Sequence, residues 1–304
     1  MTFAVVCPGQ GTQQPAMGAP WRDHGAFGLV ARAEDALGEP LAPLVLDATA
    51  EELSRTRNAQ LAVLLTSLVV WETIKESIDA PVAFAGHSLG QVTAMIASGA
   101  IPIEDGVRFA ARRAELTQAA ADAHPGKMAA LIGATPEQAE EACTAAPDAC
   151  WVANDNAPGQ VVIAGTPEGL ELASVRAKEL GVKRALPLDV GGAFHTPLMA
   201  DAHDGLVAQL ADTTILDTTR PVVSNHDGMP YADAKGWTQR LADHVTVPVR
   251  WRYCQETLAR LGATTFLEVG HGTMLAGLAK RTVPDVTVLG IATPTDLPRL
   301  EELQ

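Results

Sequence analysis

The sequence predicts an α/β protein in which a large domain with a parallel sheet carries a smaller inserted domain. Three observations indicate this fold class. Short β-like runs alternate with longer helical patterns, as they do in a parallel sheet with crossover helices. Two of the early runs end in Gly-rich turns, at residues 9–13 and 86–90. From about Gly126 the β-like and helical segments become short and closely spaced, which indicates a second unit.

The first two strands of the large domain are expected in the runs FAVVCPG (residues 3–9) and APVAFAGHS (residues 80–88). Residues 58–77, between them, are apolar over more than half of the helical circumference, which predicts a helix buried in the core. Parallel strands joined by a crossover end at the same edge of a sheet. The two Gly-rich turns are therefore expected to lie side by side, where open α/β sheets bind their ligands.

Residues 125–192 are expected to form the small domain, in the order β-α-β-α-β, with one strand over residues 150–165. Both of its helices begin with Thr-Pro-Glu, at Thr135 and Thr166, which places threonine at the N-cap and proline in the first turn. Such a block resembles a ferredoxin-like unit inserted into a larger α/β domain.

The large domain is expected to comprise residues 1–124 and to resume over residues 193–304. Its second half again mixes helical and β-like patterns. It resumes with residues 194–211, where Thr196-Pro197 is the expected start of a helix, and with residues 220–228. Helices are predicted within residues 235–245 and 252–262, and a strand within residues 264–270. No internal repeat or low-complexity tract interrupts this order.

Charge and composition limit the possible partners. Hydrophobic residues make up 47% of the chain and charged ones 19%, which is typical of a globular protein. The net charge of −14 disfavours nucleic acid and anionic membranes, and an anionic substrate would need a local cationic group. No apolar run is long enough to span a bilayer and the first residues lack a signal-peptide pattern, so we expect a soluble cytoplasmic protein.

The four cysteines show no CxxC spacing and lie in apolar or helical surroundings. We expect them to be reduced and mostly buried, and to form neither a disulfide framework nor a zinc site. They are Cys7, Cys143, Cys150 and Cys254.

The sequence GHSLG, residues 86–90, follows a predicted strand and precedes a predicted helix. This is the nucleophile-elbow pattern, in which glycines permit a cramped turn and the serine hydroxyl projects beside the N–H groups of a helix N-terminus. It predicts that Ser88 is a nucleophile and that the large domain is α/β-hydrolase-like. In the alternative interpretation Ser88 only caps the helix, and Ser88→Ala would leave activity intact.

A serine nucleophile needs a base, and His195 is the preferred candidate. It follows Gly191 and Gly192 and precedes the helix start at Thr196-Pro197, which places it at the edge of a cleft. His87 lies in the elbow and is interpreted as a packing or hydrogen-bonding residue. The remaining histidines stay open as alternatives: His24, His124, His203, His226, His244 and His271.

Two further features fit acyl chemistry. The Gly-rich turn at residues 9–13 differs from phosphate-binding loops, and its backbone N–H groups could complete an oxyanion hole. Arg113 follows Ser88 by one helical crossover. A helical arginine is usually a solvated surface residue, but a buried arginine that faces the cleft would bind a carboxylate.

Seven motifs, in this order and at roughly this spacing, are similar to those of the malonyl-CoA:acyl carrier protein transacylases. They extend over essentially the whole chain: PGQGTQ, GHSLG, ARRAELTQ, VANDNAPGQVVIAG, GAFHTPLM, PVRW and FLEVGHGTMLAGLAKR. The occurrence of all seven motifs in one chain is far more specific for this family than any single motif. The chain most resembles the stand-alone enzymes of fatty acid and polyketide synthesis.

The resemblance implies a catalytic role for each matching residue. Ser88 would be the nucleophile that malonyl-CoA acylates, and His195 would be its general base and then its general acid. A backbone carbonyl near His244, and not a carboxylate, would orient His195. The backbone N–H groups of Gln10 and Leu89 would form the oxyanion hole.

The resemblance also implies the substrates. Arg113 would pair with the malonyl carboxylate, and Phe194 is similar to the phenylalanine of members that use unbranched malonyl groups. A coenzyme A thioester would be the donor and the phosphopantetheine thiol of an acyl carrier protein the acceptor, with no permanently bound cofactor and no metal. We expect a monomer that the acidic carrier approaches at a basic patch, with these candidates: Lys127, Lys183, Arg184, Lys280 and Arg281.

Four positions depart from the family pattern. Gln91 replaces the usual glutamate, Thr117 a methionine and His244 a glutamine, and His271 interrupts a Gly-Pro-Gly sequence. None of these changes removes a catalytic group, because the role expected at position 244 is a backbone one. In the resemblance Thr117 and His244 border the acyl pocket, so they affect selectivity more than activity.

Two other classes of function stay open. A thioesterase-like hydrolase would share GxSxG and the histidine, but would release free malonate as fast as it acylates a carrier protein. A non-catalytic docking subunit would tolerate the loss of Ser88 and His195. Among the transferases, the alternative is a trans-acting polyketide enzyme with a different extender unit.

Overall fold

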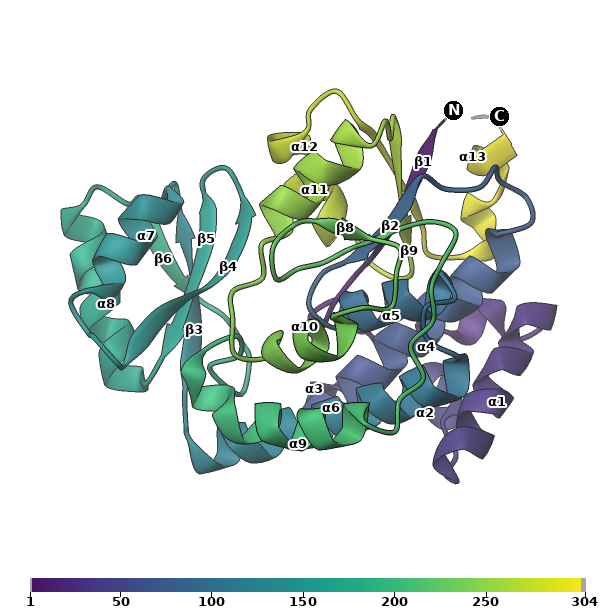
Figure 1. Ribbon diagram of the computed structural model, residues 1–304, viewed down its shortest axis with the longest axis horizontal. Helices are drawn as coiled ribbons and strands as arrows, with labels where there is room; N and C mark the ends of the chain where they lie inside the picture. Colours follow the sequence, from purple (N-terminus) through teal and green to yellow (C-terminus); the bar gives the residue numbers. More distant parts are fainter. Residues whose placement is uncertain (1, 302–304) are drawn as a thin grey trace.

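The computed structural model describes residues 2–301, which form two β-sheets with their own helices (Figure 1). The larger sheet has the strand order β10-β9-β1-β2-β7-β8. Its strands are β1 (Phe3–Cys7), β2 (Ala83–Gly86), β7 (Val222–Val223), β8 (Pro230–Tyr231), β9 (Thr265–Val269) and β10 (Thr287–Ile291). All neighbours pair in parallel except β7 and β8. The parallel sheet predicted for the large domain is confirmed.

β1 lies in the middle of this sheet, between β2 and β9. Every residue of β1 and of β2 is buried, as expected for parallel strands that are covered on both faces. Cys7 at the end of β1 is in register with Gly86 at the end of β2. The two Gly-rich turns therefore leave the sheet at the same edge, as the sequence predicts.

Helices cover both faces of the larger sheet. On one face, α11 (Trp251–Arg260) and α12 (Met274–Thr282) share a hydrophobic core with β1 and β2. The core on the other face includes α1 (Gly28–Leu37), α2 (Ala42–Leu46), α3 (Ala50–Ser54), α4 (Thr56–Ile74), α5 (Leu89–Ala97), α6 (Ile103–Ala123), α9 (Ala200–Leu210), α10 (Trp237–Asp243) and α13 (Pro298–Glu301). α4 is the core helix predicted at residues 58–77, and 15 of its 19 residues are buried.

The second half of the large domain follows the predicted order. α10 and β9 lie within their expected ranges, α9 follows the helix start expected at Thr196-Pro197, and α11 begins one residue before its range. β7 lies within residues 220–228, for which no type was predicted. β10, α1 and α12 lie outside the predicted elements. Short 3-10 helices complete the described chain: η1 (Ala19–Trp21), η2 (Gly25–Phe27), η3 (Pro197–Met199) and η4 (Pro294–Asp296).

The smaller sheet is antiparallel and has the strand order β4-β5-β3-β6. Its strands are β3 (Lys127–Ile132), β4 (Cys150–Ala157), β5 (Gln160–Gly165) and β6 (Arg184–Pro187). α7 (Pro136–Cys143) and α8 (Pro167–Glu179) pack on one face, and the hydroxyls of Thr135 and Thr166 cap them as predicted. The other face packs against Ala193 and Phe194, where the chain returns to the larger unit (teal to green in Figure 1).

The prediction of a single strand over residues 150–165 is wrong, because β4 and β5 form a hairpin there. Pro158 has no N–H with which to continue a ladder, and Gly159 adopts a positive φ of 75° in the turn. The order in this unit is therefore β-α-β-β-α-β.

Two further expectations concern the whole described chain. The four cysteines are free and buried, as predicted. Within residues 2–301, no helix has the length and apolar character needed to cross a membrane.

Candidate active site

Ser88 lies in a strained turn between β2 and α5. Its φ of 52° and ψ of −110° fall outside the regions that residues with side chains prefer. A Cβ on Gly86 would lie 1.8 Å from the carbonyl oxygen of Gly90, and a Cβ on Gly90 would lie 2.1 Å from that of Cys7. Only glycine fits at these two positions, so the spacing of the motif sets the path of the turn.

The turn that follows β1 lies directly against this elbow. The N–H of His87 donates to the carbonyl of Cys7 at 3.0 Å, and a Cβ on Gly9 would lie 2.4 Å from the carbonyl oxygen of His87. The side-by-side arrangement predicted for the two turns is confirmed. Within residues 2–301, the backbone N–H groups of Gln10 and Leu89 have no acceptor, so each turn has at least one free donor.

The ring of His195 connects Ser88 to a backbone carbonyl. Its Nε2 lies 2.8 Å from the Oγ of Ser88, and its Nδ1 lies 2.7 Å from the carbonyl oxygen of His244. The carbonyl can only accept, so Nδ1 carries the proton and Nε2 presents a lone pair to the serine hydroxyl. Burial, with the charge of Arg113 nearby, lowers the pKa of His195 to about 3. The ring is therefore a neutral base at physiological pH.

Arg113 of α6 is a buried cation that points at Ser88. Its Nη2 lies 3.2 Å from the Oγ of Ser88, and its Nη1 donates to the side-chain oxygen of Gln60 at 2.7 Å. Only 4% of Arg113 is exposed, and burial lowers its pKa to about 10. Its Nε has no hydrogen-bond partner, and no carboxylate among residues 2–301 pairs with it. The charge is therefore buried without a counter-charge among these residues.

Gln60 was not predicted as a site residue. It lies in the buried helix α4 and is 2% exposed. Its amide oxygen accepts from Arg113, and its amide nitrogen donates to the side-chain oxygen of Gln10 at 3.2 Å. Gln60 thus joins the arginine to the turn after β1. The signal in the sequence is an amide side chain directly before the apolar run at residues 61–65, because such a group requires partners when it is buried.

Asn225, just after β7, was also missed, and it holds the elbow at three points. Its Oδ1 accepts from the N–H of Ser88 at 2.9 Å, its Nδ2 donates to the carbonyl of Gly86 at 2.8 Å, and its own N–H donates to the side-chain oxygen of Gln91 at 2.9 Å. These contacts give Gln91 a role as a partner of Asn225. The side-chain nitrogen of Gln91 has no partner among residues 2–301.

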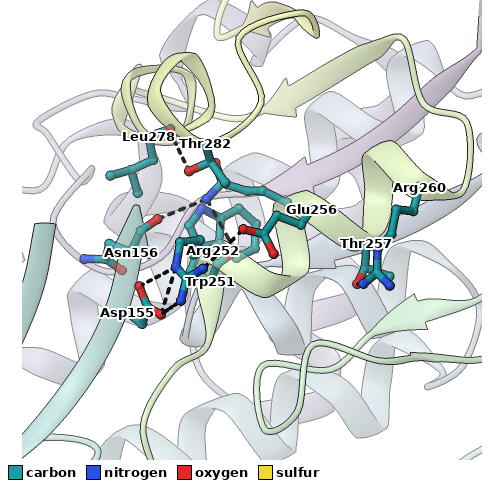
Figure 2. Close-up of polar contacts among 10 residues, drawn as sticks. Asp155, Asn156, Trp251, Arg252, Glu256, Thr257, Arg260, Leu278 and Thr282 are labelled. Atoms are coloured by element: carbon teal, nitrogen blue, oxygen red, sulfur yellow. Dashed lines mark hydrogen bonds and ion pairs between the residues drawn. The ribbon is translucent and has the colours of Figure 1, made fainter. Parts of the chain in front are cut away.

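The elbow is also connected to the smaller sheet. The Nε2 of His87 lies 2.7 Å from the Oδ1 of Asn156, at the end of β4. Figure 2 shows how β4 is held on α11: the carboxylate of Asp155 pairs with the guanidinium of Arg252 at 2.7 Å. Gln255 of α11 adds a hydrogen bond of 3.0 Å to the carbonyl of Asn156. These contacts set the position of β4 relative to the nucleophile turn.

Three other predicted site residues surround this group. Thr117 lies one helical turn after Arg113, and its hydroxyl donates to the carbonyl of Arg113 at 2.8 Å. The ring of His244 is buried, and its centroid lies 5.2 Å from that of His195. Phe194 precedes His195 and packs between the main core and the core of the smaller sheet.

The five candidates for a basic patch are all exposed, but they do not form one group. Arg184 is in register with Ile132, whose other neighbour is Gln160. Arg281 of α12 donates to the side chain of Gln160, so Arg281 and Arg184 lie at the same end of the smaller sheet, together with Lys183. Lys127 begins the six-residue strand β3 and lies at its opposite end, roughly 17 Å away.

Comparisons with known proteins match both the sequence and the fold. The model of the acyl transferase domain matches residues 4–300. A malonyl CoA-acyl carrier protein transacylase of Bacillus subtilis is 38% identical over 297 residues, which is 96% of this chain and 94% of that protein. The Escherichia coli protein of the same name is 37% identical over 310 residues, or 99% of each chain.

Solved structures give the same result. An acyl carrier protein S-malonyltransferase from Vibrio cholerae superposes with a TM-score of 0.94 at 34% identity, over 99% of this chain and 100% of that one. A malonyl-transacylase solved in complex with a type II PKS acyl carrier protein has a TM-score of 0.95 at 34% identity, over the full length of both chains.

The fold and the matched model define the class of the protein as an acyltransferase. The chain belongs to the family of the malonyl CoA-acyl carrier protein transacylases.

Proposed function

We propose that the protein transfers a malonyl group from malonyl-CoA to the phosphopantetheine thiol of an acyl carrier protein through a covalent acyl-serine. The observation that carries this proposal is the uncompensated guanidinium of Arg113 beside Ser88. In a malonyl group only one methylene separates the carboxylate from the acyl carbon. A cation within 3.2 Å of the nucleophilic oxygen therefore suits a short diacid and leaves a neutral acyl group without its partner.

The first half-reaction forms the acyl-enzyme. His195 takes the hydroxyl proton of Ser88 on Nε2 as the oxygen attacks the thioester carbonyl. The free N–H groups of Gln10 and Leu89 are the donors proposed for the oxyanion, because the N–H of Ser88 is already bonded to Asn225. The imidazolium then protonates the departing thiolate of coenzyme A. The second half-reaction runs in reverse with the carrier thiol as nucleophile.

Charge links substrate binding to the basicity of His195. The Arg113 charge is one cause of the low pKa of His195 in the free protein. A malonyl carboxylate bound to Arg113 would offset that charge, so the pKa of His195 would rise when the correct substrate is bound. The base is thus strengthened at the step where it must accept a proton.

Selectivity for the acyl group is proposed to depend on Phe194, Thr117 and His244. Phe194 supports unbranched malonyl as the acyl group. Thr117 is smaller than the methionine usual at its position, and this is the observation that favours the second candidate, a trans-acting polyketide acyltransferase with a different extender unit. A thioesterase-like hydrolase is disfavoured because it has no need for a cation beside the nucleophile.

The proposal is tested by acylating the purified protein with a panel of acyl-CoA thioesters and measuring its intact mass. Malonyl-CoA should give one malonyl adduct, which should be absent in Ser88→Ala and should pass to an added carrier protein. Equal labelling by acetyl-CoA would contradict the role of Arg113. Release of free malonate as fast as the carrier is acylated would indicate the hydrolase instead.

The acceptor is proposed to bind at the end of the smaller sheet that carries Lys183, Arg184 and Arg281. Lys280 is on the same helix as Arg281, whereas Lys127 lies at the other end of β3, which removes it from this surface. An acidic carrier would be attracted there despite the net charge of −14. The transfer step should therefore slow as salt is raised, while acylation by malonyl-CoA should change less.

The finer description of the molecule is also a proposal. We propose an α/β-hydrolase-like large domain, residues 1–124 and 193–304, with a ferredoxin-like small domain at residues 125–192. The elbow at Ser88 supports the first description, and the β-α-β-β-α-β order with antiparallel strands β4-β5-β3-β6 supports the second. We further propose a cytoplasmic monomer that holds no permanent cofactor.

A further inference from the structure

Cys143 and Cys150 lie at the two ends of a tight loop between α7 and β4. One residue connects these ends by hydrogen bonds: the N–H of Ala146 donates to the carbonyl of Cys143 at 3.0 Å, and its carbonyl accepts from the N–H of Cys150 at 3.1 Å. Asp148 adopts a positive φ of 59°, which completes the reversal of the chain. The loop brings the two sulfur atoms to 3.9 Å.

The two thiols are part of the wall of a cavity of about 330 Å³ that also reaches the catalytic base. The cavity is lined by Glu140, Trp151, Val152, Pro197, Thr246 and Pro248 together with Cys143, Cys150 and His195. The wall, as formed by residues 2–301, includes neither Ser88 nor Arg113. The cavity therefore approaches His195 from a side other than that of the nucleophile.

The environment of this pair differs from that of the other two cysteines. Cys7 and Cys254 are completely buried, and burial raises the pKa of both thiols. Between Cys143 and Cys150, the hydrogen bond donated by the Cys143 thiol lowers the pKa of Cys150 and raises that of Cys143. Cys150 is therefore the better nucleophile of the pair, and Cys143 is placed to react second.

We propose that Cys143 and Cys150 form a redox-active dithiol that hydrogen peroxide oxidises to a disulfide, and that this modification controls the catalytic histidine. The Cys150 thiolate attacks one oxygen of the peroxide, the O–O bond breaks, and the other oxygen leaves as hydroxide, which takes up a proton to form water. The Cys143 sulfur then attacks the Cys150 sulfenic acid, the S–O bond breaks, and a second water leaves. Two electrons pass from the two thiols to one peroxide.

The bond would alter the wall of the cavity next to His195. The sulfur atoms must approach from 3.9 Å to about 2.05 Å, which moves the end of α7 toward the start of β4. β4 is hydrogen-bonded to the segment that orients His195: the N–H of Asp155 donates to the carbonyl of Val249, whose N–H donates to Ala153, both at 2.9 Å. That segment includes the His244 carbonyl on the Nδ1 of His195. The oxidised protein should therefore acylate Ser88 several-fold more slowly.

The experiment treats the full-length reduced protein with hydrogen peroxide and follows two independent readouts. Intact mass and peptide mapping should show the loss of two hydrogen atoms and a link between Cys143 and Cys150, with Cys7 and Cys254 still reduced. The rate of Ser88 acylation by malonyl-CoA should fall and should recover after dithiothreitol. The first readout does not depend on the enzymatic activity.

Cys143→Ser and Cys150→Ser are the control variants. Each should fold, keep the activity of the reduced wild type and lose the peroxide-dependent fall in rate. Peroxide treatment that leaves both thiols free to react with an alkylating reagent would overturn the dithiol site. A disulfide that forms without any change in acylation rate would overturn the link to His195, and so would a peroxide-sensitive rate in Cys143→Ser.

Discussion

Asn225 holds the turn at Ser88 through hydrogen bonds to Gly86, Ser88 and Gln91, so we expect its effect on the reaction to be indirect. It touches no reacting atom, and it fixes the direction in which the strained turn presents the Ser88 hydroxyl. It also occupies the N–H of Ser88, while the N–H groups of Gln10 and Leu89 stay free. Asn225 is a positioning residue in this sense.

Asn225→Ala should slow the reaction of Ser88 more than it changes the fold. The substitution leaves the N–H of Ser88 and the carbonyl of Gly86 without partners. Each unpaired buried group costs about 1–3 kcal/mol of free energy. If this free-energy cost distorts the turn that presents the Ser88 hydroxyl, the rate of the Ser88 reaction should drop by about tenfold or more. Asn225→Asp keeps an acceptor for Ser88 and should be intermediate. The rate of inactivation by a sulfonyl fluoride, compared with the melting temperature, measures the effect, and an unchanged rate in Asn225→Ala would contradict it.

The proposed role of Arg113 in the choice of substrate is also tested at the scale of a single residue. Arg113→Ala should lose discrimination of malonyl over acetyl by roughly 2–5 kcal/mol, as expected when one partner of a buried ion pair is removed. The ratio of kcat/KM for malonyl-CoA and acetyl-CoA measures this loss. Arg112 is the matched control, because its side chain is 47% exposed and pairs with Glu115 at the surface. Arg112→Ala should leave the ratio unchanged, and a similar loss there would argue against a specific role for Arg113.

At the scale of elements, the elbow depends on a close contact between α5 and the end of β1. Gly90 lies in the first turn of α5, and a Cβ added to it would lie 2.1 Å from the carbonyl oxygen of Cys7. Gly277 lies in α12, and a Cβ added there would meet no atom within 4 Å. The two glycines thus share a helical backbone but differ in their surroundings.

Gly90→Ala and Gly277→Ala should therefore change stability in opposite directions. Gly277→Ala should raise the free energy of unfolding by about 0.5–1 kcal/mol, because alanine loses less conformational freedom in a helix. Gly90→Ala must displace the backbone of β1 or of α5 and should destabilise the protein by about 3 kcal/mol or more, with loss of acylation. Urea denaturation measures both variants. Equal effects would mean that helix propensity, and not contact with the sheet, accounts for Gly90.

At the scale of the whole molecule, buried titratable groups make stability depend on pH. His87, His195 and His244 have pKa values below the ordinary 6.5, mainly because burial disfavours the imidazolium. Below pH 6.5 the unfolded chain binds protons that the folded chain does not, so their contribution to stability is lost as pH falls from 6.5 towards 3. Glu268 has the opposite sign: burial raises its pKa to about 7, so its contribution is full below 4.5 and is lost as pH rises through 7.

His271 adds a fourth lowered pKa, whereas the hydrogen bonds of His203 to Asp204 and Asp243 raise its pKa. With four histidines against Glu268 and His203, the free energy of unfolding should fall between pH 7 and pH 5. Urea denaturation at a series of pH values measures this slope. Glu268→Gln removes the opposing contribution and should make the fall steeper. A stability that rises as pH is lowered over this range would contradict the account, because it would mean that the folded histidines bind protons as readily as the unfolded ones.

Several elements could be predicted from the sequence because the interactions that form them involve residues close together in the chain. The buried helix α4 is a continuous apolar segment, and Thr135 and Thr166 cap helices through contacts within one turn of chain. The hairpin of β4 and β5 was missed although its turn residues, Pro158 and Gly159, are also local. Because the β-like pattern is strong on both sides of that turn, it favoured the prediction of one continuous strand.

The sequence by itself determined the parallel sheet, the elbow at Ser88, the family and the residue types available for the chemistry, because these follow from short-range periodicity and from motifs. Only the tertiary structure decided which distant groups meet. Ser88 and His195 are 107 positions apart, and Ser88 and Asn225 are 137 apart. Each of these residues contributes a few polar atoms of one side chain or peptide group, and no periodic pattern in the sequence marks such isolated residues. Gln60, Asn225 and the Cys143–Cys150 cavity could be recognised only once packing had excluded water from these groups and left them with particular partners.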